Sequence, residues 1–116
     1  MAADELTPQL KVTAKSDDRA ALGISFGLTG SKRDTAGVFV NEHDDPAVAH
    51  DIMETMEKMV PRQGKYTHAE GNSDAHLKAS LVGHTVQVIL EDGRLRLGPW
   101  QALYFAEFDG PRQRQV

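Results

Sequence analysis

The chain has 116 residues, of which 40% are hydrophobic and five are histidines, and it contains no cysteine. That length suits one domain with its own core, so we expect a single domain over residues 1–116 with residues 1–7 frayed. The lack of cysteine excludes disulfides, thiolate metal sites and cysteine nucleophiles. A formal net charge of −4 argues against general nucleic-acid binding. No apolar run reaches the roughly 18 residues of a membrane span, and no basic, apolar leader opens the chain. We therefore expect a cytoplasmic protein that binds neither nucleic acid nor membrane.

The first part of the chain predicts three strands. Leu10, Val12 and Ala14 alternate with polar residues, which is typical of a half-buried strand. Residues 16–21 are polar and few, so they predict a loop or about one helical turn. Further strands are predicted over residues 22–28 and 36–41, with a loop rich in glycine, serine and charge between them.

The clearest helix begins after Asp45, a good N-cap that is followed by Pro46 at the first helical position. Apolar residues recur every three or four positions and predict one stripe on this helix: Val48, Ile52, Met56 and Met59. We expect the methionines to fill the core. Glu54 and Lys58 form a favourable i,i+4 pair on another side, and Pro61 ends the helix.

The second half predicts a short helix and a run of strands. Asp74 can cap a helix that runs to residue 81 and ends at Gly83. Strands over residues 85–90 and 94–97 flank a turn at residues 91–93, where Gly93 supplies positive φ. Residues 100–108 and 112–116 predict two more strands. The expected class is α+β, with two helices and a mostly antiparallel β meander.

Polar side chains gather between residues 66 and 78. If His76 opens a helix and His68 lies on the loop before it, the two rings converge, and two imidazoles with a carboxylate form a divalent transition-metal set. The alternative is a pair of surface histidines in a polar loop. Lys78 lies two residues after His76, about 200° away on a helix, so a solvated lysine is the alternative to a site residue.

Four other candidate site residues are weighed against purely structural roles: Glu42, Gln101, Arg112 and Arg114. Glu42 lies before the helix cap and is not explained by capping. Gln101 can bind a ligand or a backbone group, and Trp100 beside it suits a core or an interface. Arg112 and Arg114 can each hold a phosphate or carboxylate, or lie solvated on an edge strand.

The second half resembles the YjbQ-like family, whose members are proposed to act as secondary thiamine-phosphate synthases. The blocks that carry the resemblance read YTHAEGN at 66–72, DAHLKASLVG at 74–83, DGRLRLG at 92–98, WQ at 100–101 and EFDGPR at 107–112. Upstream, TAGV at 35–38, NE at 41–42 and DP at 45–46 also fit. The resemblance covers about residues 35–116.

This resemblance implies an α+β fold, a homotrimer, and a polar site near a subunit boundary. The implied reaction joins a pyrimidine pyrophosphate to a thiazole phosphate and releases pyrophosphate, so the partner is a phosphorylated small molecule. The implied cofactor is a divalent metal, zinc or magnesium. The implied metal ligands are His68 and His76, the implied catalytic residues are Lys78, Glu42 and Gln101, and the implied ligand- or cofactor-binding residues are Asn72, Arg33 and Arg112.

Three departures from the family pattern bear on function. Arg33 stands where the family has a third histidine, which should weaken metal binding strongly unless Asp34, Glu42 or His43 substitutes. Pro99 replaces the threonine of a Gly-Thr-Trp-Gln corner. The region before residue 35 is short and leaves little room for the family's helix between its first two strands. The alternative function is a non-catalytic trimer that binds a metabolite or a metal.

Overall fold

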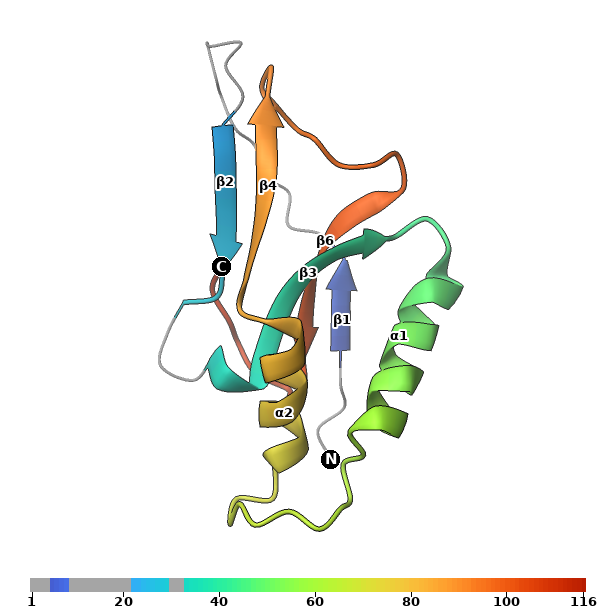
Figure 1. Ribbon diagram of the computed structural model, residues 1–116, viewed down its shortest axis with the longest axis vertical. Coiled ribbons are helices and arrows are strands. Elements are labelled where there is room, and N and C mark those ends of the chain that lie inside the picture. Colours follow the sequence, from blue (N-terminus) through green and yellow to red (C-terminus); the bar gives the residue numbers. More distant parts are fainter. Residues whose placement is uncertain (1–4, 9–21, 30–32) are drawn as a thin grey trace.

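Two three-stranded antiparallel sheets and two α-helices make up the described part of the chain (Figure 1). The computed structural model describes residues 5–8, 22–29 and 33–116. The strand expected around residues 10–14 and the loop at 16–21 lie outside them. In chain order the elements are β1 (Glu5–Pro8), β2 (Leu22–Gly27), the 3-10 helix η1 (Arg33–Thr35), β3 (Ala36–Glu42), α1 (Pro46–Met59), α2 (Ser73–Val82), β4 (Thr85–Glu91), β5 (Arg94–Leu95) and β6 (Gln101–Glu107).

The strands follow the orders β1-β6-β3 and β2-β4-β5. The expected α+β class with antiparallel strands and two helices is confirmed. Strands β4 and β5 form the predicted hairpin, with Asp92 at φ 52° and Gly93 at φ 72° in its turn. Strand β6 follows that hairpin in the chain and pairs with β3 and β1 in the other sheet. Its register with β3 sets Ala36 opposite Glu107 and Glu42 opposite Gln101.

Two expectations at the ends of the chain are wrong. Residues 5–7, part of the segment 1–7 that was expected to fray, belong to β1, because backbone pairing with β6 needs no apolar pattern. Residues 112–116 were expected to form an edge strand, but they hold only an isolated bridge between Thr29 and Gln115. Strand β5 is also shorter than expected and ends at Leu95.

Helix α1 begins as the sequence predicts. The Asp45 side chain accepts a hydrogen bond from Ala47 N at 2.9 Å, and the Glu54–Lys58 ion pair is 3.0 Å long. None of the α1 residues is buried, however, and Met59 is 63% exposed. The expectation that the methionines fill the core is therefore wrong for Met59, because α1 stands at the margin of the sheet (Figure 1).

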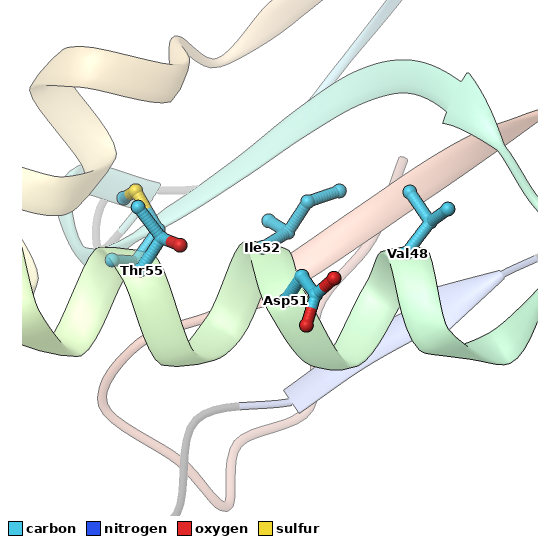
Figure 2. Close-up of a pocket in the computed structure, with 5 residues that line it drawn as sticks. Val48, Asp51, Ile52 and Thr55 are labelled. Atoms are coloured by element: carbon cyan, nitrogen blue, oxygen red, sulfur yellow. The ribbon is translucent and has the colours of Figure 1, made fainter.

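An apolar hollow of about 380 Å³ runs along α1. Val48 and Ile52 leave the same side of the helix (Figure 2), and Met56 packs against the core. The remaining lining residues are Asp51 and Thr55. Neither helix of the described chain is long and apolar enough to cross a membrane.

Helix α2 packs closely against β3 through small residues. Ala75 and Ala79 are each 1% exposed and share a core cluster with Ala106 and Phe108. A Cβ on Gly37 would lie 2.6 Å from Val82 Cγ1, so only glycine allows this approach. Asn72, rather than the expected Asp74, precedes the helix as its N-cap, and Gly83 ends it at φ 92° as predicted.

Candidate functional site

His68 and His76 meet at the start of α2. His68 lies on the loop between the two α-helices and His76 on α2, and their ring centroids are 5.1 Å apart with the planes at 85°. The convergence that the sequence predicted is present within one chain. It places two imidazoles where they can share a ligand.

A carboxylate flanks each ring. His76 Nδ1 lies 3.6 Å from Asp34 Oδ2, and His68 Nε2 lies 3.6 Å from Glu70 Oε2. Ligand atoms of these four residues do not gather in threes within 4.8 Å of one another. Within the described ranges that criterion is met on the exposed face of α1, by His50, Asp51 and Glu54. The carboxylates therefore flank the imidazole pair instead of converging with it.

These donors fit one of the two implied metals. Imidazole nitrogen is a common ligand of zinc, whereas magnesium prefers oxygen ligands and retains several waters. With His68 and His76 as the two nearest donors, the residues present suit zinc or a similar transition metal. They do not form a site of the kind that magnesium prefers.

A hydrogen-bonded network lies beside this pair. Asn72 Nδ2 donates to Asp109 Oδ2 at 2.8 Å, and Arg112 Nη2 donates to the same oxygen at 2.9 Å. Arg112 Nε also donates to the Asp109 carbonyl oxygen at 2.9 Å. Asn72 caps α2 one turn before His76, whose backbone N donates to the Asn72 carbonyl oxygen at 3.4 Å. Asn72 Oδ1 is buried and has no hydrogen-bond partner.

Asp109 and Arg112 shift each other's pKa within this network. Burial raises the pKa of the Asp109 carboxyl, but hydrogen bonds from Asn72 and Arg112 outweigh burial and hold that pKa below its ordinary value. The hydrogen bond to Asp109 in turn raises the pKa of Arg112, and the Asp34 charge adds to this effect. Asp34, the carboxylate beside His76, therefore interacts electrostatically with Arg112 of this network.

Lys78 lies on another side of α2. Its side chain is fully buried, and Nζ donates to Glu57 Oε2 of α1 at 2.8 Å and to Asp74 Oδ2 at 3.1 Å. The hydrogen bond from Lys78 lowers the pKa of Glu57. The alternative of a solvated Lys78 is wrong. Its buried cation is stabilised by the carboxylates of Asp74, one turn earlier on α2, and of Glu57 on α1.

Glu42 and Gln101 lie at the far end of β3 and β6. They face each other in the strand register, and the length of seven-residue β3 places Glu42 about 20 Å from Ala36 at the other end of the strand. Gln101 Oε1 accepts a hydrogen bond from Gly98 N at 2.6 Å. Trp100, beside them, is 59% exposed and is therefore not a core residue of this chain.

Arg33 binds a backbone carbonyl oxygen of its own chain. Its Nη1 donates to the Leu28 carbonyl oxygen at 3.2 Å and supports the chain before η1. Of the three substitutes considered for the missing histidine, Asp34 lies beside His76. Glu42 and His43 lie at the end of β3, which the strand length sets about 20 Å from its start.

The sequence did not predict the buried ion pair between Arg114 and Glu107, or the role of Asp109 as an acceptor shared by Asn72 and Arg112. Arg114 Nε donates to Glu107 Oε1 at 2.8 Å, with side chains 8% and 1% exposed. Arg114 Nη2 also donates to Thr35 Oγ1 at 2.8 Å. The sequence left two alternatives open for Arg114, and the structure has the one in which it holds a carboxylate. Asp109 was read only as a turn residue, although the EFDGPR block contained the signal that Glu107, Asp109 and an arginine act together.

The sequence and the fold place this chain among the YjbQ-like proteins. The family model described as UPF0047 protein YjbQ-like matches residues 10–116, and the chain belongs to this family. The UPF0047 protein MJ1081 of Methanocaldococcus jannaschii is 43% identical over 111 residues, which cover 96% of this chain and 78% of that protein. The UPF0047 protein YugU of Bacillus subtilis is 48% identical over 95 residues, which cover 79% and 72%.

Solved structures show the same fold. The conserved hypothetical protein TT1486 from Thermus thermophilus superposes with a TM-score of 0.74 at 36% identity, covering 97% of this chain and 94% of that one. A conserved YjbQ/UPF0047 family protein from Clostridium acetobutylicum gives a TM-score of 0.69 at 35% identity, covering 95% and 92%. These neighbours establish family and fold.

Proposed function

We propose that the chain is a metal-assisted enzyme of the thiamine-phosphate synthase type, which joins a pyrimidine pyrophosphate to a thiazole phosphate and releases pyrophosphate. The family resemblance supplies the reaction. The observation that carries the site is the 5.1 Å approach of the His68 and His76 rings. A divalent metal held by these two rings would supply positive charge to the phosphate oxygens of the substrate.

Arg112 is the described arginine best placed to assist. Asp109 takes up two N–H groups of its guanidinium, and arginine has five. The remaining donors of this exposed side chain can bind a phosphate oxygen, with the direction of the guanidinium fixed by Asp109. Charge that develops on the departing pyrophosphate would then meet a preorganised cation.

We further propose that the site is shared between copies in a homotrimer. Glu42 and Gln101 lie about 20 Å along β3 from Ala36, and Ala36 directly follows η1, which carries the Asp34 contact to His76. They reach a histidine site only if this end of β3 and β6 lies against the neighbouring copy. The exposed Trp100 beside Gln101 suits the centre of such a contact.

Mixing variants tests the shared site. His76→Ala and Gln101→Ala are each expected to abolish thiamine-phosphate formation. Co-refolded in equal amounts, they should recover about a quarter of wild-type activity, because a quarter of the junctions in a cyclic trimer then hold two intact halves. A mixture of His76→Ala with His68→Ala should recover nothing, since both changes lie in the same half. Light scattering on the purified protein gives the copy number directly.

The alternative is a non-catalytic member that binds a metabolite or a metal, and one observation favours it. Lys78, which the resemblance implied to be catalytic, is buried and bonded to two carboxylates, while Arg33 donates to a backbone carbonyl. Fewer cations are thus available for pyrophosphate than the resemblance implied. Tight binding of zinc without turnover would support this alternative.

The direct experiment measures thiamine-phosphate formation by purified, zinc-loaded protein prepared without an affinity tag. Wild type is compared with His76→Ala and with Arg112→Gln. Loss of both zinc and turnover in His76→Ala, and of turnover alone in Arg112→Gln, supports the enzyme. If wild type neither binds zinc nor forms product, the enzyme and the metal-binding form of the alternative are both refuted. The cytoplasmic location remains a prediction.

A further inference from the structure

We infer that Glu107 is a positioning residue for the Arg112 guanidinium, and that the buried Arg114 is the cation that holds Glu107 in place. The inference rests on the proposed function, because it takes Arg112 as the cation that binds a phosphate group. It goes beyond that function, because it brings into the site an ion pair that the chain itself covers. The side chains of Arg114 and Glu107 are only 8% and 1% exposed.

Glu107 is the acceptor at the centre of this arrangement. Its Oε1 accepts a hydrogen bond from Arg114 Nε at 2.8 Å, and its Oε2 accepts from Arg114 Nη2 at 3.1 Å. The same Oε2 accepts from the backbone N of Asp109 at 3.2 Å. Burial of a carboxylate is costly unless the charge is paired and hydrogen-bonded. Arg114 therefore allows a charged acceptor to lie against the Asp109 backbone.

Asp109 passes this constraint on to Arg112. The Asp109 carbonyl oxygen accepts from Arg112 Nε at 2.9 Å, and the carboxylate Oδ2 accepts from Arg112 Nη2 at 2.9 Å. Both acceptors belong to one residue, so a movement of the Asp109 backbone displaces both. Asn72 Nδ2 fixes the carboxylate from the side of α2 at 2.8 Å, whereas the carbonyl oxygen follows the backbone, whose N–H Glu107 holds.

Arg114 is itself anchored to the core. Its Nη2 donates to Thr35 Oγ1 of η1 at 2.8 Å, and Thr35 is 4% exposed. The Thr35 carbonyl oxygen accepts from Phe108 N at 3.1 Å, so η1 also holds the residue between Glu107 and Asp109. A continuous line of hydrogen bonds therefore runs from η1 through the buried ion pair to the Asp109 backbone.

A purely structural ion pair is the alternative, and it predicts a different pattern. Loss of the pair would then loosen the fold in general and weaken phosphate binding whether or not Arg112 is present. If Glu107 acts through Arg112, its effect on binding disappears once Arg112 has been replaced. Such non-additivity of two changes is the measure of coupling between residues of one network.

Two double variants isolate the acceptor. Arg114→Met/Glu107→Gln and Arg114→Met/Glu107→Met both remove the whole ion pair, so neither leaves a lone buried charge. The first keeps an amide oxygen for Asp109 N, whereas the second, of similar length, offers only a weak sulfur acceptor. Far-ultraviolet circular dichroism checks that both keep the wild-type fold.

Nitrogen-15 NMR of arginine-labelled, metal-free protein measures the positioning without any ligand. The order parameter of the Arg112 Nε–H should be about 0.85 in wild type, as in a rigid backbone, and should fall below about 0.6 in Arg114→Met/Glu107→Met. Arg114→Met/Glu107→Gln should stay near the wild-type value. A flexible Arg112 in wild type, or equal values in the two double variants, would overturn the inference and leave the proposed function standing.

Binding of inorganic pyrophosphate, measured by calorimetry on the same metal-free proteins, tests the consequence for the site. Arg114→Met/Glu107→Met should bind about 3–10-fold more weakly than Arg114→Met/Glu107→Gln, the range for loss of one hydrogen bond. With Arg112→Gln added to each, the two should bind equally. A difference that persists there would support the structural alternative and overturn the inference.

Arg96→Met is the matched control, because Arg96 pairs with Glu91 at 3.2 Å on the β4–β5 hairpin but is 62% exposed. It should change neither the order of Arg112 nor the binding of pyrophosphate. Absence of pyrophosphate binding in wild type, together with an ordered Arg112, would refute the phosphate-binding role of Arg112 in the proposed enzyme. The NMR result would then still establish the positioning of Arg112 by Glu107.

Discussion

Replacing Lys78 by methionine tests the buried charge cluster that joins α1 to α2. The lysine side chain is fully buried and the Asp74 side chain is 4% exposed, with Nζ and Oδ2 3.1 Å apart. Methionine keeps the length and the apolar stem but removes the cation, so Asp74 is left buried without it. Loss of one partner from such a pair costs about 3–5 kcal/mol. The Glu57 contact adds little, because that side chain is 48% exposed.

Urea unfolding followed by far-ultraviolet circular dichroism measures the effect, at one fixed protein concentration because an oligomer's stability depends on it. Lys58→Met is the matched control. Lys58 pairs with Glu54 at 3.0 Å, but its side chain is 73% exposed, so its loss should cost at most about 0.5 kcal/mol. The variant Asp74→Asn/Lys78→Met should regain most of the lost stability, since it no longer buries a lone charge. A cost below about 1 kcal/mol for Lys78→Met would refute the reasoning.

Three other changes have defined outcomes. The pKa of Asp109 lies below its ordinary value in the folded chain. This carboxylate therefore stabilises the fold above its unfolded pKa of about 3.9 and loses that effect as pH falls through the folded pKa. Thermal melts of Asp109→Asn should show a smaller loss of stability below about pH 4 than melts of wild type. Arg114→Lys should cost about 1.5–3 kcal/mol in urea unfolding, because lysine cannot reproduce the two-oxygen contact with Glu107; equal stability would contradict it. Gly37→Ala should cost about 1–3 kcal/mol by the same measurement, because its Cβ would lie 2.6 Å from Val82.

Local signals in the sequence located most elements of the fold. The cap at Asp45 with Pro46, the glycine stop at Gly83 and the turn around Gly93 each act within a few residues, and the structure has all three. Strand β1 carries no such signal, since it is held by backbone pairing with a strand about 100 residues later. The pairing of β6 with β3 depends on the same kind of long-range choice.

The site shows the same division. The approach of His68 to His76 follows from a loop that leads directly into a helix, an arrangement that the sequence left open beside a pair of surface histidines. The burial of Lys78 could not be predicted, because Glu57 lies 21 residues earlier and on a different helix. Asp34 reaches His76 only because α2 packs against η1, which required knowledge of the tertiary fold.

Trp100 gives this protein a built-in optical probe. It is the only tryptophan of the chain, and its indole is already 59% in contact with solvent in the folded chain. Denaturation should therefore shift its emission little. A blue shift under native conditions would instead report that another surface has covered the tip of β6, which lets assembly be followed by light without any label.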